Sequence, residues 1–213
     1  MARLVLLALE FAALFILLPL LIYFRILPNF PIPYLLVTAL VIFIVLRRDP
    51  SFPSAALFTW GKVHQQLVPL LLRNLLFLAL LGIAVRAFAP DLLFSFVKRA
   101  PVFWTVVMLL YPLLSVYPQE LLYRAFFFHR YAPLYGSGWG LFLASAAAFG
   151  FVHIVFGNWL SVGLCVIGGL LFSFTYHSSG SLLLTCLDHA IFGDFIFTIG
   201  LGQFFYHGSG LRF

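Results

Sequence analysis

Long runs of apolar residues, separated by short polar segments, follow one another along the chain. They cover about residues 3–24, 32–46, 66–87, 101–117, 139–156, 159–177 and 181–201. A membrane-crossing helix needs roughly 20 mostly apolar residues, and two of these runs are shorter than that. Barrel strands are short and alternate between apolar and polar residues, which these runs do not. The pattern predicts an all-α, polytopic transmembrane helical bundle of about seven helices, within a range of six to eight.

The composition also indicates that most of the chain is surrounded by lipid. Of the 213 residues, 64% are hydrophobic and 8% are charged, whereas a soluble domain carries about 25% charged residues. So few charges could not cover a water-exposed surface, which excludes a water-soluble globular domain. The net charge of +6 fits attraction to anionic headgroups, so membrane lipids are expected partners. The basic residues are scattered between the runs, so no nucleic-acid partner is expected.

The first apolar run is longer than the apolar part of a typical secretion signal. It contains Glu10 and ends without a small-residue cleavage pattern, so we expect it to remain a helix of the mature protein. A small chain without a targeting extension indicates an integral protein of a bacterial inner membrane.

The segment 47–65, RRDPSFPSAALFTWGKVHQ, breaks the apolar pattern with two prolines and mixed polarity. It is typical of an amphipathic linker or of a helix that lies in the membrane interface. No repeat or second domain is visible, so residues 1–213 are expected to form a single membrane domain.

Ionisable side chains within the predicted spans are few, and such groups indicate function by default because they are costly in lipid. They are Glu10, Arg73, Glu120, Arg124, His153, Asp188, His189 and Asp194. We expect Arg73 to reach the headgroups with its long side chain. For Glu10, a hydrogen-bonded structural carboxyl and a functional one both stay open. Cys165 and Cys186 lie in separate spans and are expected to be packing residues.

Glu120 and Arg124 lie four residues apart, on one face of a helix, and can form an ion pair. Such a pair holds the carboxylate in place and favours its charged form. Taken alone, it is a structural salt bridge. Gln119 points about 100° around the helix from Glu120, so the two side chains cannot face the same point.

Two further segments, FGFVH ending at His153 and LDHAIFGD containing His189, each place a histidine in an apolar helix. A lone histidine there is usually a packing or hydrogen-bonding residue. Helices of a bundle can, however, bring both histidines and the Glu120–Arg124 helix around one polar pocket. Such a pocket could hold and activate a water molecule against a peptide bond.

In this order, the motifs resemble those of the CPBP intramembrane proteases, which include CAAX-processing enzymes and Abi-type immunity proteins. The family pattern is a Glu-Glu-x-x-x-Arg helix, then Phe-x-x-x-His, then a later His followed by Asn or Asp. This chain has Gln119-Glu120-x-x-x-Arg124, then Phe149-x-x-x-His153, then His189 with Asp194. The similarity covers about residues 100–205, and the first three spans add little. It implies an endopeptidase that hydrolyses a peptide bond in a membrane-associated protein or peptide.

The chain departs from the family at two kinds of position. The first glutamate, which in the family acts as general base with the motif histidine, is Gln119 here, and an amide cannot accept the proton of water. The family often has Asn or Asp four residues after each histidine. Those positions are glycines here, and Asn158 and Asp194 come one residue later, rotated by about 100° on an ideal helix. A kink at either glycine would have to compensate.

Three interpretations of Gln119 follow. Glu120 is the base, with Gln119 as its hydrogen-bonding partner; or His153 is the base; or the site is inactive. If the chemistry is retained, we assign water activation to Glu120 and His153. By resemblance, His189 with Asp194 steadies the oxyanion, and Arg124 positions Glu120.

A metal ion is another way to activate water. Glu120, His153 and His189 match a two-histidine, one-carboxylate zinc ligand set in type. No His-Glu-x-x-His helix is present in the sequence to support it, so zinc is left open.

Two other functions compete with proteolysis. An inactive family member could serve as a membrane binding or immunity-type protein, which Gln119 favours. A transporter would use Glu10, Asp188 and Asp194 as a proton path, but no matching pair of broken helices supports it.

Overall fold

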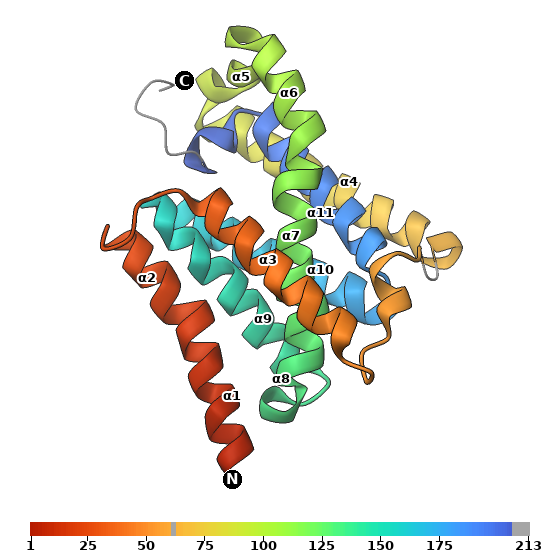
Figure 1. The fold of residues 1–213 in the computed structure, drawn as a ribbon. Coiled ribbons are helices and arrows are strands. Elements are labelled where there is room, and N and C mark those ends of the chain that lie inside the picture. Colours follow the sequence, from red (N-terminus) through yellow and green to blue (C-terminus); the bar gives the residue numbers. More distant parts are fainter. Residues whose placement is uncertain (61–62, 206–213) are drawn as a thin grey trace.

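The computed structural model describes residues 1–60 and 63–205, which form helices and connections without a strand. Figure 1 shows the chain. The α-helices are α1 (Ala2–Ala12), α2 (Leu18–Tyr23), α3 (Pro31–Arg48), α4 (Val63–Phe88), α5 (Ser95–Arg99), α6 (Pro101–Tyr111), α7 (Tyr117–Glu120), α8 (Phe127–Tyr135), α9 (Trp139–Val152), α10 (Trp159–Ser179) and α11 (Leu182–Thr198). Short π or 3-10 turns join or follow them at Ala13–Leu17, Ser54–Leu57, Pro90–Leu92, Pro112–Val116, Leu121–Phe126, His153–Phe156 and Leu201–Phe205.

Six helices in the described part of the chain are long and apolar enough to cross a membrane. They are Ala2–Tyr23, Pro31–Arg48, Val63–Phe88, Pro101–Tyr135, Trp139–Phe156 and Trp159–Ser179. The 17 residues of α11 form a seventh, shorter helix. The predicted all-α polytopic bundle, with six to eight helices, is therefore confirmed.

The fourth predicted span was too short. In place of a span over 101–117, one continuous helix extends from Pro101 to Tyr135. Two π-helical turns, Pro112–Val116 and Leu121–Phe126, interrupt its α-helical geometry. A π turn absorbs an extra residue without breaking the helix, so Pro112 starts such a turn and does not end the helix. The Gln119–Arg124 motif consequently lies in the middle of the longest helix.

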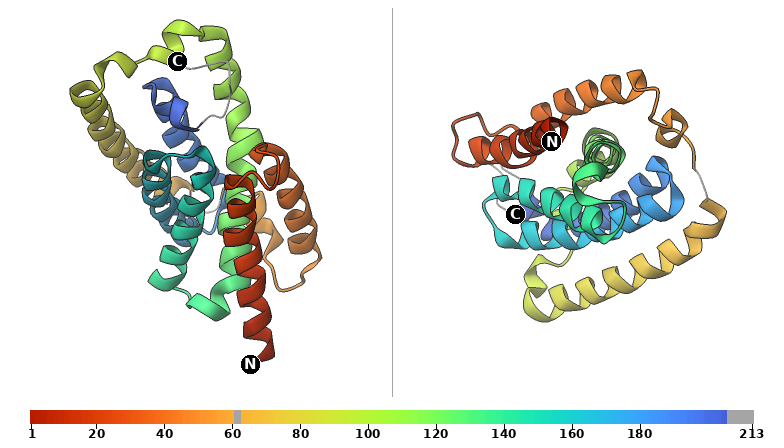
Figure 2. Two further views of the ribbon diagram at one scale, coloured as in Figure 1. Left: turned by 90° about the vertical axis from the view of Figure 1, so that its left-hand side faces the viewer. Right: turned by 90° about the horizontal axis from the view of Figure 1, so that it is seen from below.

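The helices are arranged in three groups, as Figure 2 shows from two further directions. The long 101–135 helix, α9, α10 and α11 form the centre. Helices α1 to α3 lie on one side of this centre, and α4 lies on the opposite side. The centre thus consists of the segments that carry the candidate site residues.

Helices α9 and α10 approach one another closely because small residues face each other. A Cβ atom on Gly169 would lie 2.9 Å from the Cα of Ala146, a distance that would force the backbones apart. Small residues are the usual means of close helix packing in lipid. The small size of Gly169 is therefore what lets these two helices pack closely.

The segment predicted as an amphipathic linker at about 47–65 begins inside α3 and ends inside α4. Its middle folds into the 3-10 turn Ser54–Leu57, with Phe52 and Leu57 buried against the core. Residues 61–62 of this segment lie outside the described residues.

Arg73 does not reach the headgroups, so that expectation is wrong. Its guanidinium pairs with the fully buried carboxylate of Asp188 and donates to Thr175 Oγ1 at 3.2 Å. Asn74 Nδ2 donates to the other Asp188 oxygen at 2.7 Å. Asp188 therefore joins α4 to α10 and α11, and its charge has a partner on the neighbouring helix.

Glu10 is a hydrogen-bonded carboxylate that joins α1 to α8. It accepts from Arg130 Nε at 3.0 Å and Nη2 at 2.6 Å, and from Tyr131 Oη at 3.0 Å. Of the two interpretations of Glu10, this arrangement is the structural one.

Candidate active site

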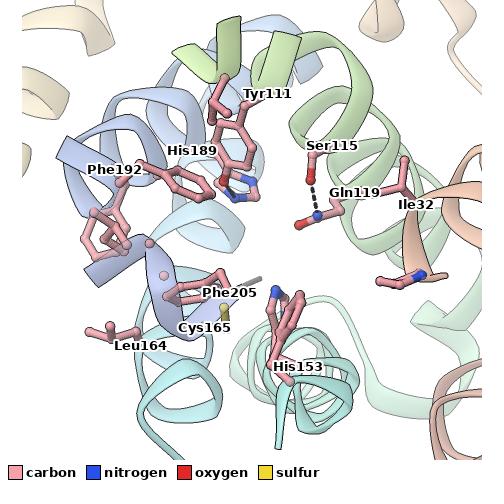
Figure 3. A pocket seen from close by; sticks show the side chains of 18 of the residues that line it. Ile32, Tyr111, Ser115, Gln119, His153, Leu164, Cys165, His189, Phe192 and Phe205 are labelled. Atoms are coloured by element: carbon pink, nitrogen blue, oxygen red, sulfur yellow. Dashed lines mark hydrogen bonds between the residues drawn. The ribbon is translucent and has the colours of Figure 1, made fainter. Parts of the chain in front are cut away.

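A cavity of about 420 Å³ lies between the centre of the bundle and α3. Its wall is mostly aliphatic and aromatic, and a few polar side chains project from it. The polar residues and the cysteine on the wall are Tyr111, Ser115, Gln119, Tyr123, His153, Cys165, His189 and Gln203. Figure 3 shows that Gln119, His153 and His189 reach into this space from three different helical segments. An apolar cavity with a few convergent polar groups is the usual form of a small-molecule or active site.

Glu120 is fully buried but is not on the cavity wall. Its Oε1 lies 2.8 Å from Nδ1 of His189, and its Oε2 lies 3.3 Å from Nε of Arg124. Neither Oε2 of Glu120 nor Nε of Arg124 has an aligned hydrogen bond in the described residues. The two side chains therefore interact as an ion pair without a hydrogen bond between these atoms. The predicted Glu120–Arg124 ion pair is present, and the carboxylate faces His189 instead of the cavity.

Arg124 is also fully buried and is held from several directions. Its Nη1 donates to Ser145 Oγ at 3.5 Å, and its Nη2 donates to the carbonyl of Gly169 at 3.3 Å. The guanidinium carbon lies 5.0 Å from the ring centre of Phe149 and 5.7 Å from that of Phe172. These contacts hold the cation, and the cation in turn holds Glu120.

His189 has a partner on each ring nitrogen. Nδ1 faces Glu120, and Nε2 lies 3.0 Å from the hydroxyl oxygen of Tyr111. Its ring stacks on Phe172, with 4.5 Å between ring centres and 18° between planes. Because an ionised carboxylate only accepts hydrogen bonds, Nδ1 of His189 carries a proton in this arrangement.

His153 approaches the cavity from the end of α9. Its Nδ1 lies 2.7 Å from the carbonyl oxygen of Phe149. A carbonyl oxygen can only accept, so Nδ1 is the protonated nitrogen, and Nε2 of the neutral ring carries the lone pair. His153 is buried, and it lines the cavity.

Gln119 lines the cavity, whereas Glu120 does not, as their spacing predicts. Its Nε2 donates to Ser115 Oγ at 2.7 Å, one helical turn earlier. In the described residues, its buried Oε1 has no hydrogen-bond donor. A buried amide oxygen on a cavity wall can orient a water molecule or a substrate N–H.

The expected partners of the two histidines lie elsewhere. Asp194 is not on the cavity wall, because α11 continues without interruption through Gly193 and leaves the one-residue offset in place. Asn158 caps α10 by accepting from the N–H of Ser161 at 2.9 Å, and it donates to the carbonyl of Phe204 at 2.8 Å. The chain does turn at Gly157, whose φ is 70°, and this turn places Asn158 at the start of α10. No kink occurs at Gly193, so the structure gives the assignment of Asp194 to the oxyanion no support.

The proposed zinc ligands do not form a ligand set. No three His, Cys, Asp or Glu side chains of the described residues are grouped so that they could hold one metal ion. Glu120 and His189 contact each other, and both ring nitrogens of His189 already have partners. The residues present do not fit zinc, and we derive no step through a metal.

Sequence reasoning missed Tyr111, Phe149 as a ring beside Arg124, and Phe172. Tyr111 lies 78 residues from His189, and aromatic residues make up 19% of the chain. Nothing in such a composition distinguishes one tyrosine from the others. The glycine at 193 was the available signal, because it leaves space beside His189 that another side chain must fill.

Residues 101–193 match the Rce1-like family of type II CAAX prenyl endopeptidases. This match confirms the resemblance predicted from the motifs. It begins at the first residue of α6 and ends at Gly193 in α11, so the Rce1-like segment contains Gln119, Glu120, Arg124, His153 and His189. Comparison with curated proteins gives no match, and comparison with solved structures gives none either.

The six apolar helices identify an integral membrane protein, and its Rce1-like segment is similar to intramembrane proteases. Helices α1 to α4 lie outside the matched residues, as the sequence predicts for the first three spans.

Proposed function

We propose that this protein hydrolyses a peptide bond of a membrane-associated protein or peptide, with His153 as the general base. The observation that carries this proposal is the orientation of His153. Its Nδ1 is engaged by the Phe149 carbonyl at 2.7 Å, which directs the unprotonated Nε2 to the water that it must activate.

In the proposed reaction, water attacks the carbonyl carbon while Nε2 of His153 takes its proton. The carbonyl electron pair moves to the oxygen and forms a tetrahedral oxyanion. When the C–N bond breaks, His153 returns the proton to the leaving nitrogen. The products are one carboxylic acid and one amine, which balance the peptide bond and the water.

Glu120 has a positioning role in this proposal. Its carboxylate is not on the cavity wall and is occupied by His189 and Arg124. Water activation therefore falls to His153, assisted by Gln119, whose free Oε1 is suited to orienting the attacking water.

The test uses the purified full-length protein in lipid or detergent with a fluorogenic peptide library. We expect cleavage by the wild type and a loss of about 10²–10⁴-fold in kcat for His153→Gln. The matched control is His177→Gln, because His177 is exposed near the end of α10 and does not line the cavity. Equal loss in both variants would contradict a specific role for His153.

A second function, a non-catalytic membrane binding or immunity-type protein, is favoured by Gln119 alone. It predicts no cleavage by the wild type and the appearance of cleavage in Gln119→Glu. Cleavage by the wild type rules it out. We also propose a bacterial inner membrane as the location, which fractionation of the source cells would check.

A further inference from the structure

We propose that the hydroxyl of Tyr111 is a catalytic hydrogen-bond donor, which stabilises the oxyanion in the hydrolysis proposed above. This role rests on the proposed function, and neither the motifs nor the family match points to Tyr111. Tyr111 is the last residue of α6 and lines the cavity. Its hydroxyl oxygen lies 3.0 Å from Nε2 of His189.

The first argument is that His189 has no nitrogen left for a substrate. Nδ1 is held by Glu120 at 2.8 Å, and Nε2 is held by Tyr111. A phenol oxygen can accept one hydrogen bond and donate another at the same time. When His189 is protonated, its Nε2–H donates to Tyr111, and the O–H of Tyr111 is free to point at the substrate.

Glu120 lies on the other side of the ring, where its Oε1 is 2.8 Å from Nδ1 of His189. Glu120, His189 and Tyr111 then form one chain of hydrogen bonds from the buried carboxylate to the cavity. Among the three hydrogen-bonded side chains Glu120, His189 and Tyr111, Tyr111 is the one with a proton to donate to the substrate.

The second argument is the glycine at position 193. A Cβ atom there would clash with the hydroxyl and ring edge of Tyr111, so only glycine leaves Tyr111 in this position. Gly193 follows His189 by four residues and therefore lies on the same face of α11. A side chain at 193 would point to the place beside His189 where the Tyr111 hydroxyl now lies.

The structure thus provides the donor from α6 in place of one from α11. The aromatic ring of Tyr111 is held by Phe197, with 5.2 Å between ring centres in an edge-to-face contact. A donor held in this way needs little reorganisation during the reaction, which is the main requirement for oxyanion stabilisation. Figure 3 shows Tyr111 beside His189 on the wall opposite His153.

The first experiment is steady-state peptide cleavage by Tyr111→Phe in the full-length protein. We expect kcat to fall by about 10²–10³-fold, because one oxyanion donor is lost, with KM changed by less than about threefold. The matched control is Tyr117→Phe, since Tyr117 lies on the same long helix and does not line the cavity. We expect its kcat to stay within about twofold of the wild type.

The second experiment moves the donor from one helix to the other. Tyr111→Ala removes the hydroxyl and the ring, and Gly193→Asn in the same chain places an amide N–H beside His189. We expect the double variant to recover at least about tenfold in kcat over Tyr111→Ala. If the double variant is no more active than Tyr111→Ala, the loss comes from the altered shape of the site, and the proposed role is overturned.

The outcomes separate this role from the proposed function. Cleavage by the wild type with an unchanged kcat in Tyr111→Phe overturns the role of Tyr111 and leaves the protease intact. A rise in KM alone overturns it as well, because a transition-state donor acts on kcat. No cleavage by the wild type overturns both.

Discussion

The guanidinium of Arg124 lies between two aromatic rings, those of Phe149 and Phe172, in a region without access to solvent. Taking both Arg124 and Glu120 out of water carries a large desolvation penalty, which their attraction at 3.3 Å only partly offsets. The contribution of the pair is therefore positional, since it holds the carboxylate that orients His189. Removing one partner of the pair should leave the other as an uncompensated buried charge.

Arg124→Met tests that argument. The methionine is close in length but leaves the buried Glu120 without its cation, so we expect the free energy of unfolding to fall by about 3–5 kcal/mol. Reversible denaturant unfolding in detergent measures this change. The double variant Arg124→Met with Glu120→Met should recover much of the loss, because no charge is then left unpaired.

The control for this series is Arg47→Met at the exposed end of α3. It removes the same charge from a position without a buried partner, and we expect a change within about 0.5 kcal/mol. If Arg124→Met and Arg47→Met cost the same, then Glu120 does not depend on Arg124 for its charge.

At this scale, sequence separation decides which contacts could be predicted. The Glu120–Arg124 pair spans four residues and follows from helix geometry alone. The Glu120–His189 contact spans 69 residues and the Tyr111–His189 contact 78, so both depend on how the helices pack. Residue types led to His153 and His189, but only packing reveals which nitrogen of each ring faces the cavity.

At the scale of the helix, the 101–135 segment differs most from its prediction. Pro112, Pro118 and the polar motif made the apolar run seem to end near residue 117. The two π turns absorb these irregularities and carry the helix on to Tyr135. π turns occur often at functional sites, and here they lie on both sides of the Gln119–Glu120 pair. Hydropathy gives the number of spans, but a π turn has no hydropathy signature.

Helix α4 is attached to the centre of the bundle by a polar cluster as well as by buried apolar side chains such as Leu78 and Val85. Arg73 and Asn74 of α4 both bind Asp188 of α11, and Thr175 of α10 donates to the same carboxylate at 2.7 Å. Much of α4 otherwise faces outward with exposed leucines, which pack against lipid in a membrane. Lipid provides little hydrophobic drive for helix association, so polar contacts and close packing must hold α4 in place.

Arg73→Leu tests this attachment. Asp188 loses its cation while remaining buried, so we expect the free energy of unfolding to fall by about 2–3 kcal/mol, reduced by the partial exposure of Arg73. Arg73→Lys should lose less, because an ammonium keeps the charge but offers a different donor geometry. Arg86→Leu, at the exposed end of the same helix, serves as the control. An equal effect of both leucine variants would show that Asp188 does not hold α4.

At the scale of the whole molecule, the N-terminal helices lie beside the Rce1-like segment, and ionic and aromatic contacts add to the aliphatic core that the two parts share. The first kind of contact is ionic, where Glu10 meets Arg130 and Asp49 lies 2.8 Å from His129. The carboxyl of Asp49 lies outside the spans, and hydrogen bonds from Ser51 and then His129 hold its pKa below its usual range.

The second kind of contact between the N-terminal helices and the Rce1-like segment is aromatic, where rings of α1 and its π turn meet rings of the 101–135 helix. The order of the spans could be predicted from hydropathy, but this mutual arrangement could not, because no local pattern indicates which helix α1 contacts.

A comparison of variants at Phe15 and Glu10 tests whether the aromatic or the ionic contacts contribute more to stability. Phe15 is 1% exposed, and its ring centre lies 5.3 Å from that of Phe127 and 5.4 Å from that of Tyr123. Phe15→Ala leaves a cavity among these rings, so we expect a loss of about 3 kcal/mol in the free energy of unfolding. Glu10→Gln should cost at most about 1 kcal/mol, because Glu10 and Arg130 are both partly exposed and such pairs are weak.

Phe24→Ala provides the matched control, since Phe24 is 65% exposed on the same N-terminal unit. It removes the same ring without opening an internal cavity, and we expect a change below about 0.5 kcal/mol. All three variants can be compared by reversible unfolding in one detergent. If Glu10→Gln proved more damaging than Phe15→Ala, the ion pair would hold the N-terminal helices in place. If Phe15→Ala lowers stability and leaves peptide cleavage intact, the N-terminal helices support the fold and the Rce1-like segment alone carries the chemistry.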